Sequence, residues 1–120
     1  MANHNDVGKL GEQIAKKNLE DKGYTILAHS WRWGKGEIDF IAQQENILVF
    51  IEVKTRKKIT FGMPEEAVSQ KKQSLMYELA VEYMYRIQYE AEFRFDVISI
   101  ILEPQQEIRH FEDAFFPNWS

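Results

Sequence analysis

Two acidic residues stand inside strand-like apolar stretches, where a charge is costly to bury. Asp39 lies in "EIDFIAQQ", and Glu52 follows 13 residues later in "NILVFIEVKT". If the two runs form a hairpin that turns at Glu45 and Asn46, Asp39 lies opposite Glu52. Carboxylates in that position repel each other. A hard divalent cation such as Mg²⁺ or Mn²⁺ between them would remove the repulsion, so the pair predicts a metal site.

A second register of the same hairpin would separate the two acids. Shifted by two residues, it would splay Asp39 and Glu52 at a solvated strand end, where each could pair with a neighbouring cation. The first register fits the apolar pattern well, because it sets Ile41 opposite Phe50 on the face of the acids. Composition alone leaves both registers open. The face opposite to the acids would carry Ile38, Phe40, Ala42, Val49, Ile51 and Val53.

Two further charged residues are candidates for the same site. Lys54 lies two residues after Glu52, so both side chains point to one face of a strand. An ammonium there could orient or help deprotonate a water molecule, or stabilise charge on a phosphoryl oxygen. The alternative is a cross-strand ion pair between Lys54 and Glu37. On the first predicted helix, Glu12 falls close to Leu19 at the margin of the apolar stripe, which makes it a weaker candidate.

Apolar periodicity predicts the elements that position these residues. Helical spacing extends from Val7 to about Lys22, and a second helix is expected to begin at Pro64 and to continue through Val68 to Ile87. Runs rich in β-branched and aromatic residues are typical of strands. The expected order is α, β, β, β, α, β, β. The expected strands cover residues 24–33, 37–44, 46–55, 93–102 and 107–111.

Length and composition limit the class of protein. A chain of 120 residues suits one domain, expected to span residues 1–120, and 44% hydrophobic residues support a folded core. No apolar run approaches the roughly 18 residues of a membrane span, so no membrane partner is expected. The N-terminal stretch has no apolar core of a secretory signal, and the chain has no cysteine. These features predict a cytoplasmic protein.

Charge is unevenly distributed along the chain, which has a net charge of −4. Residues 1–75 contain 12 Lys and Arg against 10 Asp and Glu, whereas residues 76–120 contain 3 against 9. The pattern is compatible with one basic, nucleic-acid-binding face on an acidic body. Ordinary solvated surface is the alternative interpretation. The candidate phosphate contacts are Arg56, Lys57, Lys58, Lys71 and Lys72.

An acid on the first helix, then "GEIDFI", then "IEVKTR" resembles the PD-(D/E)XK nuclease superfamily. That superfamily has an αβββαβ core with Asp on the second strand and Glu-X-Lys on the third. Within it, the chain resembles the YraN-like family of small bacterial proteins, which is similar to archaeal Holliday junction resolvases. The resemblance extends from about Gly8 to "FEDAF". Ile38 stands where the superfamily name has Pro, as is ordinary for the resolvase-like branch.

The resemblance implies a fold and an activity. The fold is a single-domain, restriction-endonuclease-like α/β fold with a mixed central sheet and an extra C-terminal strand. The activity is metal-dependent endonucleolytic hydrolysis of DNA, with branched or junction DNA as a candidate substrate. The alternative is a nucleic-acid-binding module of the same fold with little catalysis, acting as a subunit of a DNA-processing complex.

The resemblance also implies roles for individual residues. Asp39, Glu52 and the backbone carbonyl of Val53 would bind Mg²⁺ or Mn²⁺. Glu12 would complete the acidic site, and Lys54 would assist the attacking water. The residues implied near the site or the DNA backbone are Gln70 and Lys71.

Two symmetric cuts in a four-way junction would need two copies of the site, which predicts a homodimer. The candidate seams are the 76–89 helix face and the tail "FEDAFFPNW", whose aromatic residues must bury against something. The alternative is that the tail folds back on its own sheet.

Overall fold

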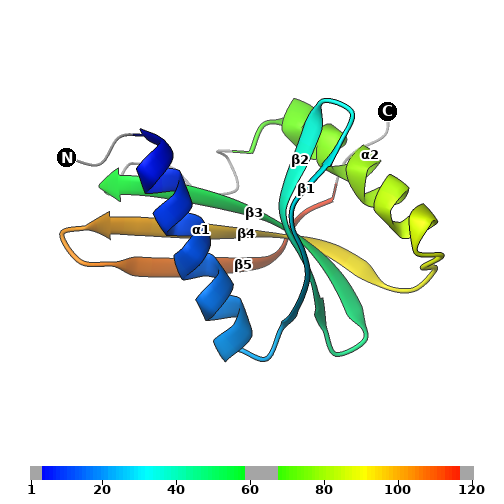
Figure 1. Ribbon diagram of the computed structural model, residues 1–120, viewed down its shortest axis with the longest axis horizontal. Coiled ribbons are helices and arrows are strands. Elements are labelled where there is room, and N and C mark those ends of the chain that lie inside the picture. The colour runs from blue at the N-terminus through cyan, green and yellow to red at the C-terminus, as the bar shows by residue number, and fades with distance from the viewer. Residues whose placement is uncertain (1–3, 59–67, 117–120) are drawn as a thin grey trace.

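Two helices and five strands make up the computed structural model, which describes residues 4–58 and 68–116. Their order along the chain is the expected α, β, β, β, α, β, β. None of the described helices is long and apolar enough to cross a membrane. The elements are α1 (His4–Asp21), β1 (Thr25–Trp33), β2 (Gly36–Gln44), β3 (Ile47–Lys58), α2 (Gln70–Arg86), β4 (Phe93–Glu103) and β5 (Glu107–Phe115) (Figure 1).

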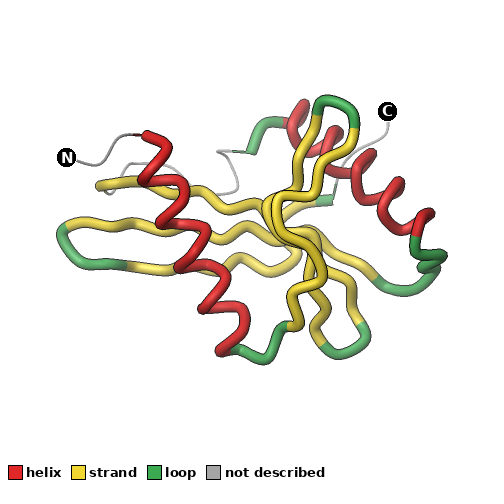
Figure 2. The backbone as a smooth tube through the Cα atoms, in the orientation of Figure 1, coloured by secondary structure: helices red, strands yellow, loops and turns green. Residues whose placement is uncertain are grey.

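The strands form one mixed sheet in the order β1-β2-β3-β4-β5. The strands β3 and β4 run parallel and are joined through α2, whereas the other neighbours are antiparallel. The sheet twists strongly, so the β1–β2 hairpin runs across the direction of β4 and β5 (Figure 2). In Figure 1, α1 lies across β3, β4 and β5, and α2 lies beside the hairpin.

Each helix closes its own apolar cluster against the sheet. Alternation along β3 explains the division, because Val49 and Ile51 face α1 whereas Leu48 and Phe50 face α2. Both faces of β3 are therefore buried up to the position of Glu52. The α1 cluster contains Ala15, Leu19, Tyr24, Phe40, Ala42, Val49, Ile51, Ile98 and Ile100. The α2 cluster contains Ile38, Ile41, Leu48, Phe50, Met76, Leu79, Ala80 and Phe95.

The β2–β3 hairpin has the register that brings the two acids together. Phe40 pairs with Ile51 and Ile41 with Phe50, so the register shifted by two is wrong. Ile41 and Phe50 share one cluster, as expected. The prediction for Ile38 is wrong, because it packs in the α2 cluster whereas Phe40 packs in the α1 cluster. The pairing of β2 with β3 ends at Phe40, and beyond that point the hairpin twist turns Ile38 toward α2.

The second helix begins later than the sequence pattern predicts. Ser69 is its N-cap, and the Ser69 hydroxyl accepts a hydrogen bond of 3.1 Å from the backbone N–H of Lys72. Val68, which was expected inside the helix, therefore precedes it, although it is buried. Pro64, the expected first helical residue, lies outside the described residues. A serine cap satisfies a free N–H of the first turn, which fixes the start at Gln70.

The last strand is longer than expected and carries the tail back onto the sheet. It continues past Phe111 to Phe115, whose ring stacks on Phe95 with 5.3 Å between centroids. Phe116 lies 6.3 Å from the ring of Tyr77. The described part of the tail thus packs on its own chain, which is the alternative to a dimer seam.

Candidate functional site

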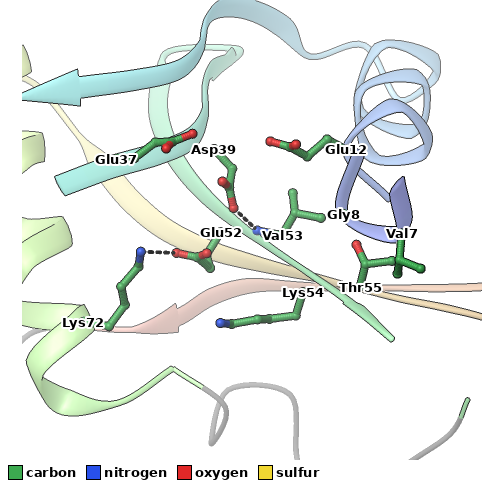
Figure 3. A pocket seen from close by; sticks show the side chains of 10 residues that line it. All are labelled: Val7, Gly8, Glu12, Glu37, Asp39, Glu52, Val53, Lys54, Thr55 and Lys72. Carbon is green, nitrogen blue, oxygen red and sulfur yellow. Dashed lines mark hydrogen bonds and ion pairs between the residues drawn. The ribbon is translucent and has the colours of Figure 1, made fainter. Parts of the chain in front are cut away.

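A pocket of about 550 Å³ opens between the first turns of α1, the strands β2 and β3, and the first turn of α2. Four carboxylates and two ammonium groups meet in it (Figure 3). Five residues that the sequence predicted for the site are brought together here: Glu12, Asp39, Glu52, Val53 and Lys54. The full lining is Val7, Gly8, Glu12, Glu37, Asp39, Glu52, Val53, Lys54, Thr55 and Lys72.

Glu52 is the most buried acid of the pocket. Its side chain is 8% exposed, and burial, with the nearby charge of Asp39, raises its pKa to about 7. Its Oε2 atom makes no hydrogen bond with any described residue, and the Nζ atom of Lys72 lies 3.5 Å away. A buried carboxylate with so little compensation is costly unless a cation binds to it.

Asp39 is held beside Glu52 by the backbone of β3. Its Oδ2 atom accepts a hydrogen bond of 2.7 Å from the backbone N–H of Val53. This bond lies beyond the last paired residues of β2 and β3, so the Asp39 side chain continues the connection between the two strands. In this contact Val53 offers its N–H, whereas the sequence implied a role for its carbonyl.

Asp39, which lies beside Glu52, also belongs to a second cluster of acidic residues. Ligand atoms of Glu12, Glu37 and Asp39 all lie within 4.8 Å of one another, so this cluster could bind a metal ion. The carboxylate of Glu12 lies 3.4 Å from Nε2 of His29. Sequence reasoning assigned neither Glu37 nor His29 to the site and considered Glu37 only as an alternative partner of Lys54. For Glu37 a signal existed, since residues 37 and 39 alternate onto one face of a strand.

The alternative interpretation of Lys54, an ion pair with Glu37, is wrong. Glu37 is instead bound by Arg32, whose Nε atom donates a hydrogen bond of 3.2 Å to its carboxylate. The reason is register, because Arg32 and Glu37 are directly opposed in the β1–β2 hairpin. Lys54 remains in the pocket, where its charge acts to lower the pKa of Glu52.

The position of Glu12 depends on the residue before it. A Cβ atom on Gly11 would lie 1.7 Å from Oγ1 of Thr55, far inside contact distance. Glycine thus lets the backbone of α1 lie directly against β3. This close approach sets Glu12 over the pocket, close to Asp39.

The first turn of α2 contributes a different residue from the one implied. Gln70 and Lys71 are exposed, and Gln70 does not line the pocket. Lys72, which was assigned to the DNA-binding surface, reaches into the pocket and pairs with Glu52. Residues two apart on a helix differ by about 200° in direction, so Gln70 and Lys72 cannot both face the site.

The remaining basic candidates lie outside the pocket. Arg56, Lys57 and Lys58 are exposed and continue β3 directly after Thr55, which lines the pocket. Lys57 lies 3.8 Å from the carboxylate of Glu103 on β4. The pocket is thus followed along the strand by three exposed cations.

The structure defines a small α/β protein with a five-stranded mixed sheet and an acidic pocket between its two helices. Residues 11–100 match the family described as "Uncharacterised protein family UPF0102". The chain belongs to this family, which confirms the resemblance to YraN-like proteins.

Relatives in this family align over nearly their full length. A UPF0102 protein of Flavobacterium psychrophilum is 47% identical over 117 residues, which cover 97% of this chain and 98% of that protein. One from Bacteroides thetaiotaomicron is 43% identical over 118 residues, covering 98% of each chain. One from Dictyoglomus turgidum is 41% identical over 117 residues, covering 97% and 98%.

A solved structure shows a weak similarity. It is SfsA of Pyrococcus furiosus in complex with Ca²⁺, at a TM-score of 0.37 and 15% identity, covering 88% of this chain. This chain spans 62% of the SfsA chain. A similarity at this level supports no inference about fold or function.

Proposed function

We propose that this protein is a metal-dependent endonuclease that hydrolyses phosphodiester bonds in DNA, built as a single PD-(D/E)XK domain over residues 1–120. The observation that carries the proposal is the buried and poorly compensated carboxylate of Glu52. Its carboxylate is buried beside Asp39 and has an oxygen without a hydrogen bond to the described part of the chain, which stability alone does not favour. A perturbed acid in a polar pocket is a common mark of a functional site.

The residues of the pocket fit a hard divalent cation. Carboxylate and carbonyl oxygens are the ligands that Mg²⁺ and Mn²⁺ prefer, and the proposed ligands are Asp39, Glu52 and the backbone carbonyl of Val53. Glu12 completes the acidic site on the side of α1. A bound cation would neutralise charge on the phosphate and lower the pKa of water.

Lys54 is the proposed catalytic cation of the pocket. It lines the pocket two residues after Glu52, with its ammonium close enough to Glu52 to act on its pKa. From this position it can orient the attacking water or stabilise charge that develops on a phosphoryl oxygen. Its role is therefore in the reaction and not in metal binding.

A DNA substrate is supported by the cations next to the pocket. Arg56, Lys57 and Lys58 follow it on β3, and Lys71 lies at the start of α2, so a phosphate backbone could be bound on either side. Branched or junction DNA is the proposed substrate class. Two copies of the chain would supply two symmetric cuts, with the outer face of α2 as the proposed seam. We place this activity in the cytoplasm.

A second candidate function is a nucleic-acid-binding subunit with little catalysis. The observation in its favour is the ion pair between Lys72 and Glu52, which gives the buried acid a cation without any metal. Such a protein would bind DNA through the same exposed cations but would not cleave it.

The two candidates are separated by incubating the protein with linear, nicked, flapped and four-way DNA, with Mg²⁺, with Mn²⁺ or with a chelator. We expect metal-dependent cleavage that Asp39→Asn and Glu52→Gln each abolish, because each change removes an anionic ligand. Lys54→Ala should lose most cleavage but keep metal binding. Glu20→Gln, at an exposed acid near the other end of α1, is the matched control. Binding without cleavage by the unchanged protein would favour the second candidate.

A further inference from the structure

Lys72 stands where a cation is not expected from helix chemistry. It lies in the first turn of α2, whose N-cap is Ser69 and whose first turn has no acidic residue. The positive end of the helix dipole disfavours a cation in this turn and favours an anion. Even so, the Lys72 side chain is only 35% exposed, and its Nζ atom is directed toward Glu52 (Figure 3).

The contact between Lys72 and Glu52 is one of charge without a hydrogen bond. The two atoms lie 3.5 Å apart, and Oε2 of Glu52 has no hydrogen-bond partner among the described residues. The Glu52 side chain is more than nine-tenths buried, so it cannot obtain compensation from water. A charge-only contact can be given up at small cost if another cation takes its place.

The carboxylate of Glu52 is also a proposed ligand of the metal ion. Two cations cannot both occupy the space beside one oxygen, because they repel each other at short distance. Lys72 and a divalent cation therefore compete for Glu52. When Lys72 leaves Glu52, its ammonium remains at the N-terminus of α2, next to the exposed Lys71. Free backbone N–H groups, the helix dipole and two ammonium groups together favour a phosphate there.

We propose that Lys72 is a displaceable counter-ion: it holds the place of the divalent cation at Glu52, and once displaced it binds a phosphate of the DNA. This inference rests on the proposed function and makes Lys72 a positioning residue for it. Because one side chain serves both sites, metal binding and DNA binding strengthen each other, and the effect is equal in both directions. The affinity of the pocket for the metal ion is therefore higher when DNA is bound.

The first test measures Mn²⁺ binding by calorimetry in the absence of DNA. Lys72→Met removes the competing ammonium and should bind Mn²⁺ about 10-fold more tightly than the unchanged protein. Lys72→Arg keeps a cation and should stay near the original affinity. Lys71→Met removes the same charge from an exposed neighbour, so it should change the affinity by less than about twofold because solvent screens it. Thermal unfolding confirms that each variant is folded.

The second test measures affinity for a phosphorothioate-linked duplex, by fluorescence anisotropy with Mn²⁺ and with a chelator. In the unchanged protein Mn²⁺ should increase the affinity, and in Lys72→Met this increase should be at least about 5-fold smaller. Lys71→Met should bind more weakly under both conditions and keep the full increase. An equal increase in Lys72→Met and in the unchanged protein would overturn the inference.

The outcomes separate this inference from the proposed function. If the unchanged protein binds Mn²⁺ and cleaves DNA, but Lys72→Met binds Mn²⁺ no more tightly, the counter-ion role is wrong and the endonuclease proposal stands. If the unchanged protein neither binds Mn²⁺ nor cleaves DNA, both proposals are wrong. Tighter Mn²⁺ binding together with a smaller increase in DNA affinity supports both.

Discussion

Glu52 on β3 and Asp96 on β4 are buried carboxylates on neighbouring parallel strands, and their surroundings differ completely. Asp96 is fully buried and accepts hydrogen bonds from Nε of Arg94 at 2.9 Å and from the backbone N–H of Asp113 at 2.9 Å. Nε2 of His110 lies 2.7 Å from its other oxygen. Among the residues that the structure describes, Oε2 of Glu52 has no hydrogen-bond partner, and the Lys72 ammonium lies 3.5 Å from it.

The comparison shows that the hydrogen-bond and charge partners of a buried carboxyl group, and not its burial, decide whether its pKa rises or falls. Burial raises the pKa of both carboxyl groups, but the hydrogen bonds from His110, Arg94 and Asp113 outweigh it and lower the pKa of Asp96. At Glu52 the nearby charge of Asp39 adds to the effect of burial, and the pKa rises to about 7. Asp96 therefore stabilises the fold, whereas Glu52 is left available for a ligand.

The Asp96 region also links distant parts of the chain. Arg94 donates a second hydrogen bond to Asp96, at 3.1 Å, and another to the hydroxyl of Tyr24, at 2.7 Å. Tyr24 follows α1, and His110 and Asp113 belong to β5. Asp96 and Arg94 together thus connect the residue before β1, the strand β4 and the edge strand β5.

The largest expected effect comes from breaking the Asp96 region. Asp96→Asn leaves the largely buried side chain of Arg94 with the half-exposed carboxylate of Glu112, 3.7 Å away, as its remaining described counter-charge, so we expect a loss of about 3–5 kcal/mol in the free energy of unfolding. Urea denaturation measures it. The control is Glu107→Gln, at an exposed acid on β5 that pairs with Arg109, with an expected loss under about 1 kcal/mol. A loss as small for Asp96→Asn would contradict the structural role.

A smaller effect is expected from pH, and it has opposite signs at the two acids. The pKa of Glu52 is raised from 4.5 to about 7, so the folded state binds the proton more tightly and stability falls as pH rises from about 4.5 to 7. The pKa of Asp96 is lowered from 3.8, so its contribution is present above that value and is lost as pH falls below it. Without metal, stability should therefore be highest on the acidic side of neutrality.

The variant Glu52→Gln isolates the contribution of Glu52 to this pH dependence. It should remove the decline between pH 5 and 7, a change of about 1–3 kcal/mol, and should be as stable as the unchanged protein or more stable at pH 7. Urea denaturation across this pH range, with a chelator present, measures the effect. A loss of several kcal/mol in Glu52→Gln at pH 7 would mean that Glu52 is structural, like Asp96.

The smallest expected effect concerns the charged surfaces around the two acids. Neutralising Lys57, Lys58 or Lys71 should each reduce the slope of log affinity for DNA against log salt by roughly 1, because each phosphate contact releases a counter-ion. Arg109→Gln, on the side of Asp96, should leave the slope unchanged. Equal effects at Arg109 and at the three lysines would mean that DNA binding is not confined to the face of Glu52.

The sequence favoured the hairpin register in which Asp39 meets Glu52, with a register shifted by two as the alternative. Strands alternate with a period of two, so the shared buried face of Ile41 and Phe50 argues against a shift by one residue, whereas a shift by two residues keeps them on one face. The same alternation placed Lys54 beside Glu52. These features depend on residues close in sequence and on one turn, which is why a local pattern could favour the register that the structure shows.

Contacts that depend on long-range packing were not predicted. Asp96 is also bound from β5, and nothing in "FRFDVISI" indicates that His110 and Asp113 turn toward it. The inward direction of Lys72 depends on where α2 begins, and the sequence pattern placed that start at Pro64, before the Ser69 cap that the structure shows. The pair of Arg32 with Glu37 required the register of β1 on β2.

The close approach of Gly11 to Thr55 has a consequence for how the sequence can vary. Any side chain at residue 11 would overlap a threonine at residue 55, so these two positions must change together. A larger residue at 11 requires a smaller one at 55, or the helix lifts and takes Glu12 away from Asp39. In an alignment of relatives we expect positions 11 and 55 to covary, although 44 residues separate them in the chain.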